Sequence, residues 1–512
     1  GTGEGGGLVL LKKLEDAIRD RDNIHAVILA TSINNDGARS NGITAPSPIA
    51  QEAVIKKAWK KAGIEPRTIT YVEAHGTGTK IGDPIEIQAL SKAFQEFTNE
   101  KNFCALGSVK SNFGHLDNAA GMAGLIKSVL SLQNKEIFPT VHFNSPNPYI
   151  DFDNSATFVS KTLTSWNPGD IKRRCGVSAF GFTGTNAHLI LEEAPVISKI
   201  SIPEDKVLLK LSSKTPESLT KYVDELKVFF ENTNHEIDNA CYTLNIGRSD
   251  YKYRYCLSAS NRFELIEKLQ AFNSTYNVSE IKNTSVIALF SGEEFNKVYH
   301  ERLYDNFHVY RSTFDSCLQY NTDNSQLFLT VLHQYALYKQ LEAWGIKFTM
   351  SIGTALGKPA NMLVTGTLKP EQLLKELNEY KKEPFDVKKL EQVIKKMPNI
   401  SNILFLEVGE KGILSQNIKE IILNNSKMMV DSFITSDNFD PFEKIAQLYT
   451  QGISIDWGLF YKRKELQRVE VPSYSFEKSR CWYKEQSVEQ VSDWFYDYSW
   501  INENLNLYKV DR

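Results

Sequence analysis

Short apolar runs and amphipathic stretches alternate along residues 1–195, with glycine-containing turns between them. Continuous apolar runs predict buried strands at 26–31, 69–72 and 189–191. Apolar positions repeating every three to four residues predict helices at 50–62 and 119–132. The second of these helices is rich in small residues, which allow close packing. This alternation of strands and helices predicts a layered α/β domain.

The pattern changes after residue 195. Residues 205–280 are poor in glycine and rich in Lys, Glu and Asn, and their periodicity predicts helices at 216–231 and 262–272. A third region begins with a strand-like run, and it contains predicted elements at 286–290, 325–344, 370–380 and 403–408. A tail containing proline and aromatic residues follows at 465–485. We therefore predict these parts: 1–195, 205–280, 286–460, 465–485, and the start of a further segment at 486–512.

Composition is that of an ordinary globular protein, with 41% hydrophobic and 24% charged residues. A net charge of -3 gives no electrostatic reason to expect nucleic acid or an anionic membrane as a partner. No apolar run approaches the roughly 18 residues of a membrane span, and no signal peptide opens the chain. Six scattered cysteines without CxxC pairs favour a reducing, cytoplasmic location. We expect both ends to be cut from a larger polypeptide.

Three motifs carry the candidate chemistry. Residues 73–79 are EAHGTGT and are followed by GDPIE at 82–86, residues 107–115 are GSVKSNFGH, and residues 176–188 are GVSAFGFTGTNAH. Taken singly, each histidine could be a structural hydrogen-bonding group, and Gly-Thr-Gly-Thr could be only a tight turn. There is no HExxH motif and no Cys/His clustering, so the sequence predicts no metal site.

In this order and spacing, the three motifs resemble the ketosynthase domains of modular polyketide synthases. The resemblance extends from Gly1 to about Pro195, and it includes GEGGG at 3–7, NDG at 35–37 and TAP at 44–46. The glycines at 3–7 would also suit a phosphate-binding loop, but no Lys-Ser/Thr follows them. The resemblance implies the carboxy-terminal half of a ketosynthase, a layered half-domain with the thiolase-like fold.

The resemblance also implies catalytic roles. Chain extension needs an enolate made by decarboxylating a malonyl thioester, and hydrogen-bond donors must face the developing oxyanion. The family pattern assigns this task to His75 and His115, whose imidazole Nε2 groups would converge on that oxygen. It implies that Lys110 and Glu86 form a charge pair that orders the site.

Further residues match positions that bind the substrate in this family. Thr77 and Thr79 match hydroxyls that hold the phosphopantetheine arm of a carrier protein, and Phe182 matches a gating aromatic. His188 is interpreted as structural. No cofactor is expected to be bound directly, since phosphopantetheine arrives on the partner acyl carrier protein. The resemblance further implies a homodimer formed through the ketosynthase.

The cysteine nucleophile of a ketosynthase lies in an elbow of the type Thr-Ala-Cys-Ser-Ser, upstream of all these motifs. No cysteine of this chain has that context: Cys104 lies in NFCAL and Cys175 in RRCGV. An acyl-enzyme cannot form without the thiolate. We therefore expect this fragment alone to be inactive in condensation, with the cysteine supplied by the larger polypeptide.

The downstream regions resemble the small α+β linker domain, at 205–280, and a shrunken, degenerate α/β acyltransferase, at 286–460. FSGEE at 290–294 replaces the family's Phe-x-Gly-Gln-Gly, and IGTALGK at 352–358 replaces Gly-His-Ser-x-Gly. Ala355 therefore occupies the position of the lost acyltransferase nucleophile. EVGE at 407–410 follows too soon for the subdomain that carries the acyltransferase histidine, and VPSYSF at 471–476 resembles the segment after an acyltransferase. The competing interpretation of 286–460 is an unrelated α/β domain.

Two functions remain open. One is part of a polyketide synthase module that catalyses decarboxylative Claisen condensation of malonyl-type units on carrier-protein thioesters. Serine-less remnants are typical of synthases served by a trans-acting acyltransferase, which would then be a second partner. The alternative is a non-catalytic docking scaffold for a carrier protein or such an acyltransferase. The basic helix at 56–61 could contact an acidic carrier protein, or it could be a solvated face.

Overall fold

The computed structural model describes residues 1–39, 46–196, 206–275, 284–292, 295–323, 325–380, 391–392, 394, 402–410, 413–422, 427–434, 439–461 and 465–481. Two compact units make up the chain. The first comprises Gly1–Val207, Asn234–Gly247 and Trp457–Val471, and the second comprises Leu208–Thr233, Arg248–Asp456 and Pro472–Arg512. Parts of the predicted linker domain, 205–280, contribute to both units. The further segment predicted at 486–512 lies outside the described residues.

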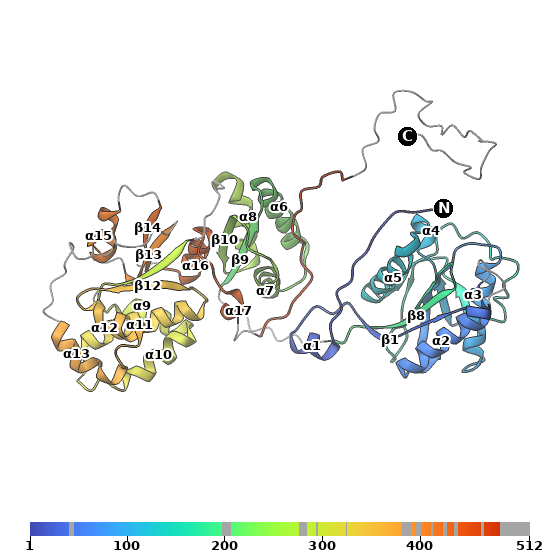
Figure 1. The fold of residues 1–512 in the computed structure, drawn as a ribbon, viewed down its shortest axis with the longest axis horizontal. Helices are drawn as coiled ribbons and strands as arrows, with labels where there is room; N and C mark the ends of the chain where they lie inside the picture. The colour runs from blue at the N-terminus through green and yellow to red at the C-terminus, as the bar shows by residue number, and fades with distance from the viewer. Residues whose placement is uncertain are drawn as a thin grey trace, which may run out of the picture. The chain divides into compact units, whose positions relative to one another are not determined.

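A six-stranded sheet forms the centre of the first unit (Figure 1). Its strand order is β1 (Ala26–Asn35), β8 (Thr185–Glu193), β7 (Arg174–Phe180), β2 (Ile69–Glu73), β3 (Cys104–Gly107) and β5 (Thr157–Val159). β1, β8 and β7 pair antiparallel. β7, β2, β3 and β5 pair parallel. The sheet is therefore mixed, and its parallel half carries the first two histidine motifs.

Helices cover both faces of this sheet. α2 (Pro48–Ala62) and α3 (Gly82–Gln95) pack on one face, where Trp59, Phe94 and Val72 lie in one core cluster. α5 (Ala120–Asn134) packs on the other face, where Leu125 lies in a second cluster with Tyr71. Neighbouring residues of β2 enter different clusters because side chains alternate across a strand. The predicted layered α/β fold is confirmed.

Shorter elements complete the first unit. They are α1 (Leu14–Arg19), η1 (Gly37–Arg39), η2 (Pro66–Thr68), α4 (Lys110–Phe113), η3 (Asp117–Ala119), β4 (Glu136–Ile137), β6 (Thr164–Ser165), α7 (Ile237–Gly247) and α17 (Trp457–Phe460). α7 and α17 are far apart in sequence but lie together, since the amide of Asn245 donates to the Tyr461 hydroxyl at 2.7 Å.

The second unit contains a parallel four-stranded sheet in the order β12 (Phe348–Gly353), β11 (Ser285–Phe290), β13 (Ile403–Glu410) and β14 (Met428–Ile434). Its helices are α9 (Lys297–Asn306), α10 (His308–Leu318), α11 (Gln326–Ala343), α12 (Gly357–Thr365), η4 (Pro370–Gln372), α13 (Leu373–Tyr380), α15 (Ile413–Ile421) and α16 (Pro441–Thr450). A separate two-stranded sheet pairs β9 (Val207–Ser213) with β10 (Tyr253–Ala259), accompanied by α6 (Pro216–Asn232) and α8 (Arg262–Thr275). None of the helices in the described ranges is both long and apolar enough to cross a membrane.

Candidate active site

The two histidine motifs meet at the carboxyl edge of the parallel strands. β2 ends at Glu73 and β3 ends at Gly107, and these two residues are paired across the strands. His75 and Lys110 therefore follow neighbouring strand ends, where α/β sheets usually bind ligands. His115 comes directly after α4, and its ring lies edge-on to that of His75, with centroids 5.7 Å apart and planes at 83°.

Residues 1–3 hold the backbone of His115. The N–H of Gly3 donates to the carbonyl of His115 at 2.8 Å, and the N–H of His115 donates to the carbonyl of Gly1 at 2.9 Å. A Cβ atom at Gly3 would lie 2.0 Å from the carbonyl oxygen of Phe113, so only glycine fits there. Gly1 and Gly3 thus hold the backbone of His115 in place, and this role replaces the alternative of a phosphate-binding loop.

The two predicted supporting residues both contact the backbone of His75. The Glu86 carboxylate accepts from the N–H of His75 at 2.7 Å and from the N–H of Gly76 at 2.9 Å. The Lys110 ammonium donates to the carbonyl of His75 at 2.5 Å. The expected charge pair differs in form: the described residues include no direct ion pair between Lys110 and Glu86. Each side chain instead fixes a different peptide group of the His75 loop.

Hydrogen bonds determine which ring nitrogen of each histidine carries the proton. The Lys110 ammonium is 3.4 Å from Nδ1 of His75 and can only donate, so this Nδ1 accepts. The N–H of Asp117 donates to Nδ1 of His115 at 2.9 Å. A neutral imidazole whose Nδ1 accepts carries its proton on Nε2. The geometry therefore makes Nε2 the donor atom of both rings.

Burial keeps the His75 ring neutral. Desolvation, followed by the positive charge of Lys110, lowers the pKa of His75 to about 3. Burial also raises the pKa of Glu86 to about 7, although two backbone N–H donors favour its ionised form. Desolvation lowers the pKa of Lys110 against the opposing effect of the nearby Glu86 and Glu73 carboxylates. At neutral pH the site can offer a hydrogen bond without a charged imidazole at His75.

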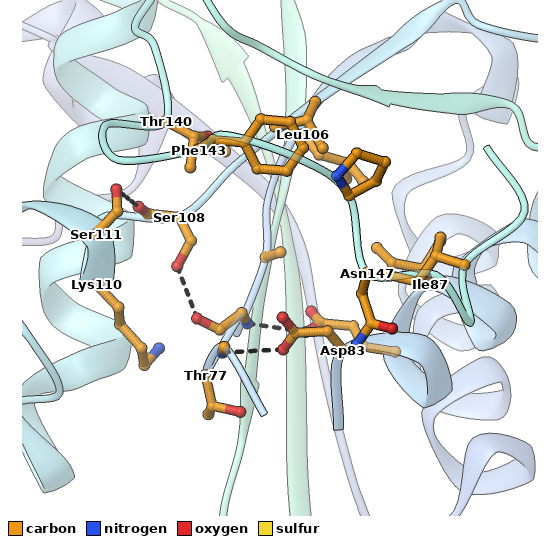
Figure 2. Close-up of a pocket in the computed structure, with 18 of the residues that line it drawn as sticks. Thr77, Asp83, Ile87, Leu106, Ser108, Lys110, Ser111, Thr140, Phe143 and Asn147 are labelled. Atoms are coloured by element: carbon orange, nitrogen blue, oxygen red, sulfur yellow. Dashed lines mark hydrogen bonds between the residues drawn. The ribbon is translucent and has the colours of Figure 1, made fainter. Parts of the chain in front are cut away.

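A pocket of about 810 Å³ opens beside the His75 loop (Figure 2). Figure 2 shows Lys110 at one side of it and Asp83 at the other. The segment 140–150, which the sequence motifs did not indicate, forms much of the remaining wall. Neither His75 nor His115 is among the lining residues. Lys110 and Glu86 both line the pocket and contact the His75 backbone.

The two predicted arm-binding threonines differ in their surroundings. Thr77 lines the pocket, whereas Thr79 does not. The Thr79 hydroxyl accepts from the N–H of Gly82 at 3.0 Å and lies 3.2 Å from the Thr77 hydroxyl. Thr79 therefore braces the turn between β2 and α3 and orients Thr77.

The third motif contributes two phenylalanines, the predicted gating aromatic Phe182 and a second one that packs against His75. Phe182 lies in the turn between β7 and β8 and is 72% exposed. Phe180, the last residue of β7, packs against His75 with ring centroids 5.8 Å apart. Strand alternation could have indicated this, because Phe180 belongs to a buried strand and Phe182 does not.

His188 is enclosed in the sheet. Its Nδ1 lies 3.1 Å from the Ser178 hydroxyl, and burial lowers its pKa to about 3. A Cβ atom at Gly176 would lie 2.8 Å from the His188 ring, so glycine makes room for it. These contacts agree with the structural interpretation of His188.

The cysteines do not resemble reactive thiols. Cys481 is exposed, and the other five are buried. Burial raises the pKa of Cys104 and of Cys175, which opposes thiolate formation. The described part of the chain contains no group of three or more His, Cys, Asp or Glu side chains that could hold a metal ion.

The basic helix predicted at 56–61 is the end of α2. Lys56 pairs with Glu52 at 2.9 Å and Glu96 at 2.6 Å, while Trp59 is buried. Lys61 donates to the carbonyl of Thr31 at 3.1 Å. These contacts favour a solvated structural face, and contact with a carrier protein stays a prediction.

The second unit contains a strand–turn–helix elbow at the predicted position. β12 ends at Gly353, α12 begins at Gly357, and Ala355 between them has a φ of 46°. A Cβ atom at Gly357 would lie 1.8 Å from the carbonyl oxygen of Phe290, and one at Gly353 would lie 2.5 Å from that of Gly357. This backbone has the shape of a nucleophile elbow, with the methyl group of Ala355 at the position where such an elbow presents its nucleophile. The predicted Glu293 and Glu294 lie outside the described residues.

Residues 472–476 of the tail belong to the second unit, where they pack against the start of α6. The Tyr474 hydroxyl accepts from the N–H of Lys214 at 3.0 Å. The Ser218 hydroxyl donates to the carbonyl of Ser475. The segment therefore lies where it can support the helix that follows β9.

Comparison with known proteins gives two family matches. Residues 25–144 match "Beta-ketoacyl synthase, C-terminal domain", and residues 207–269 match "CurL-like, PKS C-terminal". Among curated relatives, polyketide synthase PksL of Bacillus subtilis is 42% identical over 291 residues, which are 56% of this chain and 6% of that protein. Polyketide synthase PksM of the same organism is 43% identical over 284 residues, or 53% of this chain and 7% of that protein.

A further relative aligns over more of the chain. This phenolphthiocerol/phthiocerol polyketide synthase of Mycobacterium tuberculosis is 33% identical over 409 residues, which are 73% of this chain and 22% of that protein. A solved ketosynthase from module 6 of the Bacillus subtilis bacillaene synthase is 41% identical, with coverage of 53% of this chain and 50% of that one, and a TM-score of 0.49. The chain thus spans only a small part of its curated relatives.

Proposed function

Because this chain carries the C-terminal ketosynthase domain of a modular polyketide synthase, we propose that His75 and His115 stabilise the enolate formed when a malonyl thioester is decarboxylated. The observation that carries this proposal is the pair of Nδ1 contacts. Lys110 and the Asp117 N–H occupy the two Nδ1 atoms and leave both Nε2–H groups to donate. Two such donors can stabilise one oxyanion.

The proposed reaction begins at the malonyl group. The bond between its carboxylate carbon and its methylene carbon breaks, carbon dioxide leaves, and the electron pair moves to the thioester oxygen. The Nε2–H groups of His75 and His115 hydrogen-bond to that oxygen. The enolate carbon then attacks the acyl thioester of a cysteine, a carbon–carbon bond forms, and the cysteine thiolate leaves. Without an acyl-cysteine to attack, the enolate carbon takes a proton and yields an acetyl thioester.

The cysteine of this reaction comes from outside residues 1–512 in our proposal. None of the six cysteines lies in an elbow sequence, and the two in the central sheet are buried and disfavour ionisation. The chain would therefore supply the decarboxylating half of the active site. Condensation would require the ketosynthase segment that holds the thiolate, together with a second copy if the domain is a dimer.

An acyl carrier protein would bring the malonyl group on its phosphopantetheine arm, so no cofactor need be resident. Thr77 would hold this arm, with support from Thr79, because Thr77 lines the pocket beside Lys110. Phe182 would act as a gate, since it is exposed on the turn that follows Phe180, the residue packed against the His75 ring. These assignments share one requirement, that the arm passes over the 76–79 loop.

The second unit would not load the malonyl group. Its elbow has the strained backbone of a nucleophile turn but presents the methyl group of Ala355. A separate, trans-acting acyltransferase would then charge the carrier protein. The same observation favours the second candidate function, in which the second unit is a docking scaffold for that acyltransferase or for the carrier protein.

Carbon dioxide release from a malonyl-loaded carrier protein tests the proposal on the 512-residue chain. His75→Ala and His115→Ala should each lower the rate by about 10²- to 10³-fold, since each removes one oxyanion donor. His25→Ala, at an exposed histidine outside the site, is the matched control and should have no effect. Equal release by the double variant His75→Ala/His115→Ala and the parent would contradict the decarboxylating role. Carrier binding without release would instead favour the scaffold.

A further inference from the structure

Glu73, the last residue of β2, is a buried carboxylate that the proposed reaction does not use. It is 1% exposed, and its Oε1 atom accepts from the N–H of Val109 at 2.6 Å. Its Oε2 atom accepts from the Tyr71 hydroxyl at 2.5 Å and lies 3.0 Å from Nζ of Lys127. The Lys127 side chain is 9% exposed, so both members of this ion pair are removed from water.

Two glycines make the space for this pair. A Cβ atom at Gly107 would lie 2.6 Å from the Tyr71 hydroxyl and 2.9 Å from Nζ of Lys127. A Cβ atom at Gly124, on α5, would lie 3.1 Å from Cγ of Glu73. A buried ion pair costs desolvation energy and is weak evidence for a purely stabilising role. The contacts of this ion pair with the segments around the site therefore point to a further role.

The Glu73 carboxylate joins the three segments that carry the site. Glu73 itself is two residues before His75 on the same strand end. Val109, whose N–H it holds, is the residue before Lys110. Lys127 belongs to α5, the helix that follows His115 in the chain. The positions of His75, Lys110 and His115 thus depend on one buried group.

We propose that Glu73, held by Lys127, is a positioning residue for decarboxylation. By fixing the N–H of Val109, it keeps the Lys110 ammonium against the carbonyl and Nδ1 of His75. This contact keeps the His75 proton on Nε2, where it can donate to the enolate oxygen. The inference rests on the proposed function, because it assigns a purpose to the Nε2–H group.

Glu73→Gln is the direct test, since glutamine keeps the size but loses the charge by which Lys127 holds this side chain in place against the N–H of Val109. In the carbon dioxide release assay we expect kcat to fall about 10- to 100-fold, with KM for the malonyl carrier protein unchanged, because a catalytic group is displaced while the arm site stays intact. The ¹⁵N NMR signals of the His75 ring should show part of the proton moving from Nε2 to Nδ1.

The double variant Glu73→Gln/Lys127→Met separates positioning from stability. Removing both charges leaves no unpaired buried ion, so the first unit should fold as well as the parent. Its kcat should nevertheless stay as low as that of Glu73→Gln. Lys210→Met is the matched control, because it breaks a buried ion pair with Asp250 at 2.7 Å, in the second unit. It should leave both kcat and the His75 signals unchanged.

Different outcomes overturn different claims. A folded Glu73→Gln variant with the parent kcat and unchanged His75 ring signals would overturn the positioning role. A double variant with the parent kcat would show that Glu73 matters only for stability. If the parent chain releases no more carbon dioxide than His75→Ala/His115→Ala, the proposed decarboxylation fails. The NMR measurement then still decides whether Glu73 controls the His75 tautomer.

Discussion

Loops that follow parallel strands present different side chains in the two units. In the first unit, the segments after β2 and β3 carry His75, Lys110 and His115, and His75 contacts both of the others. In the second unit, the turn after β12 keeps its two close-packed glycines and a positive φ, but it presents only the methyl group of Ala355. The second unit therefore combines a tightly packed turn with an unreactive side chain. Glycines preserve a turn because packing demands them, whether or not the turn still carries a reactive group.

Gly357→Ala should give the largest effect, because it adds a methyl group inside the tightly packed turn after β12. The added Cβ would lie 1.8 Å from the carbonyl oxygen of Phe290 on the neighbouring strand. We expect a loss of about 3 kcal/mol or more in the free energy of unfolding of the second unit. Urea denaturation followed by hydrogen exchange of the β11 amides would measure it.

Gly366→Ala, at the other end of α12, is the matched control. No atom lies within 4 Å of its added Cβ, but its φ is 76°. It should cost only about 1 kcal/mol, which reflects a left-handed conformation without a clash. If Gly357→Ala were no worse than Gly366→Ala, the elbow would not be the tightly packed turn described above.

The ionisation of Glu86 should give a moderate, pH-dependent effect in the first unit. Burial raises its pKa to about 7, so the N–H signals of His75 and Gly76 should titrate with a midpoint near 7. The folded state holds this proton more tightly than the unfolded state does, so Glu86 should reduce stability as pH rises from about 4.5 to about 7.

Glu86→Gln removes the titrating group while keeping an acceptor for the two N–H donors. Both amide signals should become independent of pH in this range, and the stability lost on raising the pH should shrink. A midpoint near 7 that persists in Glu86→Gln would mean that another group titrates beside the His75 loop.

Ala355→Ser should have the smallest effect, although it restores the hydroxyl that the elbow lacks. The neighbouring position holds threonine where acyltransferases have histidine, so no base is adjacent to activate the new hydroxyl. Mass spectrometry after incubation with a malonyl thioester should find no adduct at position 355. A stable malonyl adduct there would show that a serine in this turn is reactive without an adjacent histidine.

Much of the fold could be predicted from the sequence, because buried strands leave recognisable apolar runs in it. β2, β11 and β13 are short and buried, so their apolar runs stand out. β8 was predicted only at 189–191, but it extends over Thr185–Glu193. Its first half alternates between buried and more exposed positions, and no continuous apolar run marks it. The predicted thiolase-like layered α/β fold is confirmed by the sheet and the family match.

The candidate site was predictable as a set of motifs but not as a set of contacts. Motif order indicated His75 and His115, yet it gave no means of finding Glu73, whose role depends on Val109 and Lys127 from other segments. It also indicated Phe182 as a gating aromatic, but it did not indicate the contact between Phe180 and His75. Contacts between segments far apart in sequence depend on how strands are ordered in the sheet, and local patterns do not contain that order.

The protonation state of the two histidines tests the central claim most directly. ¹⁵N NMR of the ring nitrogens in the 512-residue chain at pH 7 would assign the tautomer of His75 and of His115. We predict that the hydrogen-bonding proton of each ring lies on Nε2, and that the His75 ring stays neutral down to about pH 3. A protonated His75, or a proton on Nδ1 of either ring, would contradict a site built to offer two Nε2–H donors to an enolate.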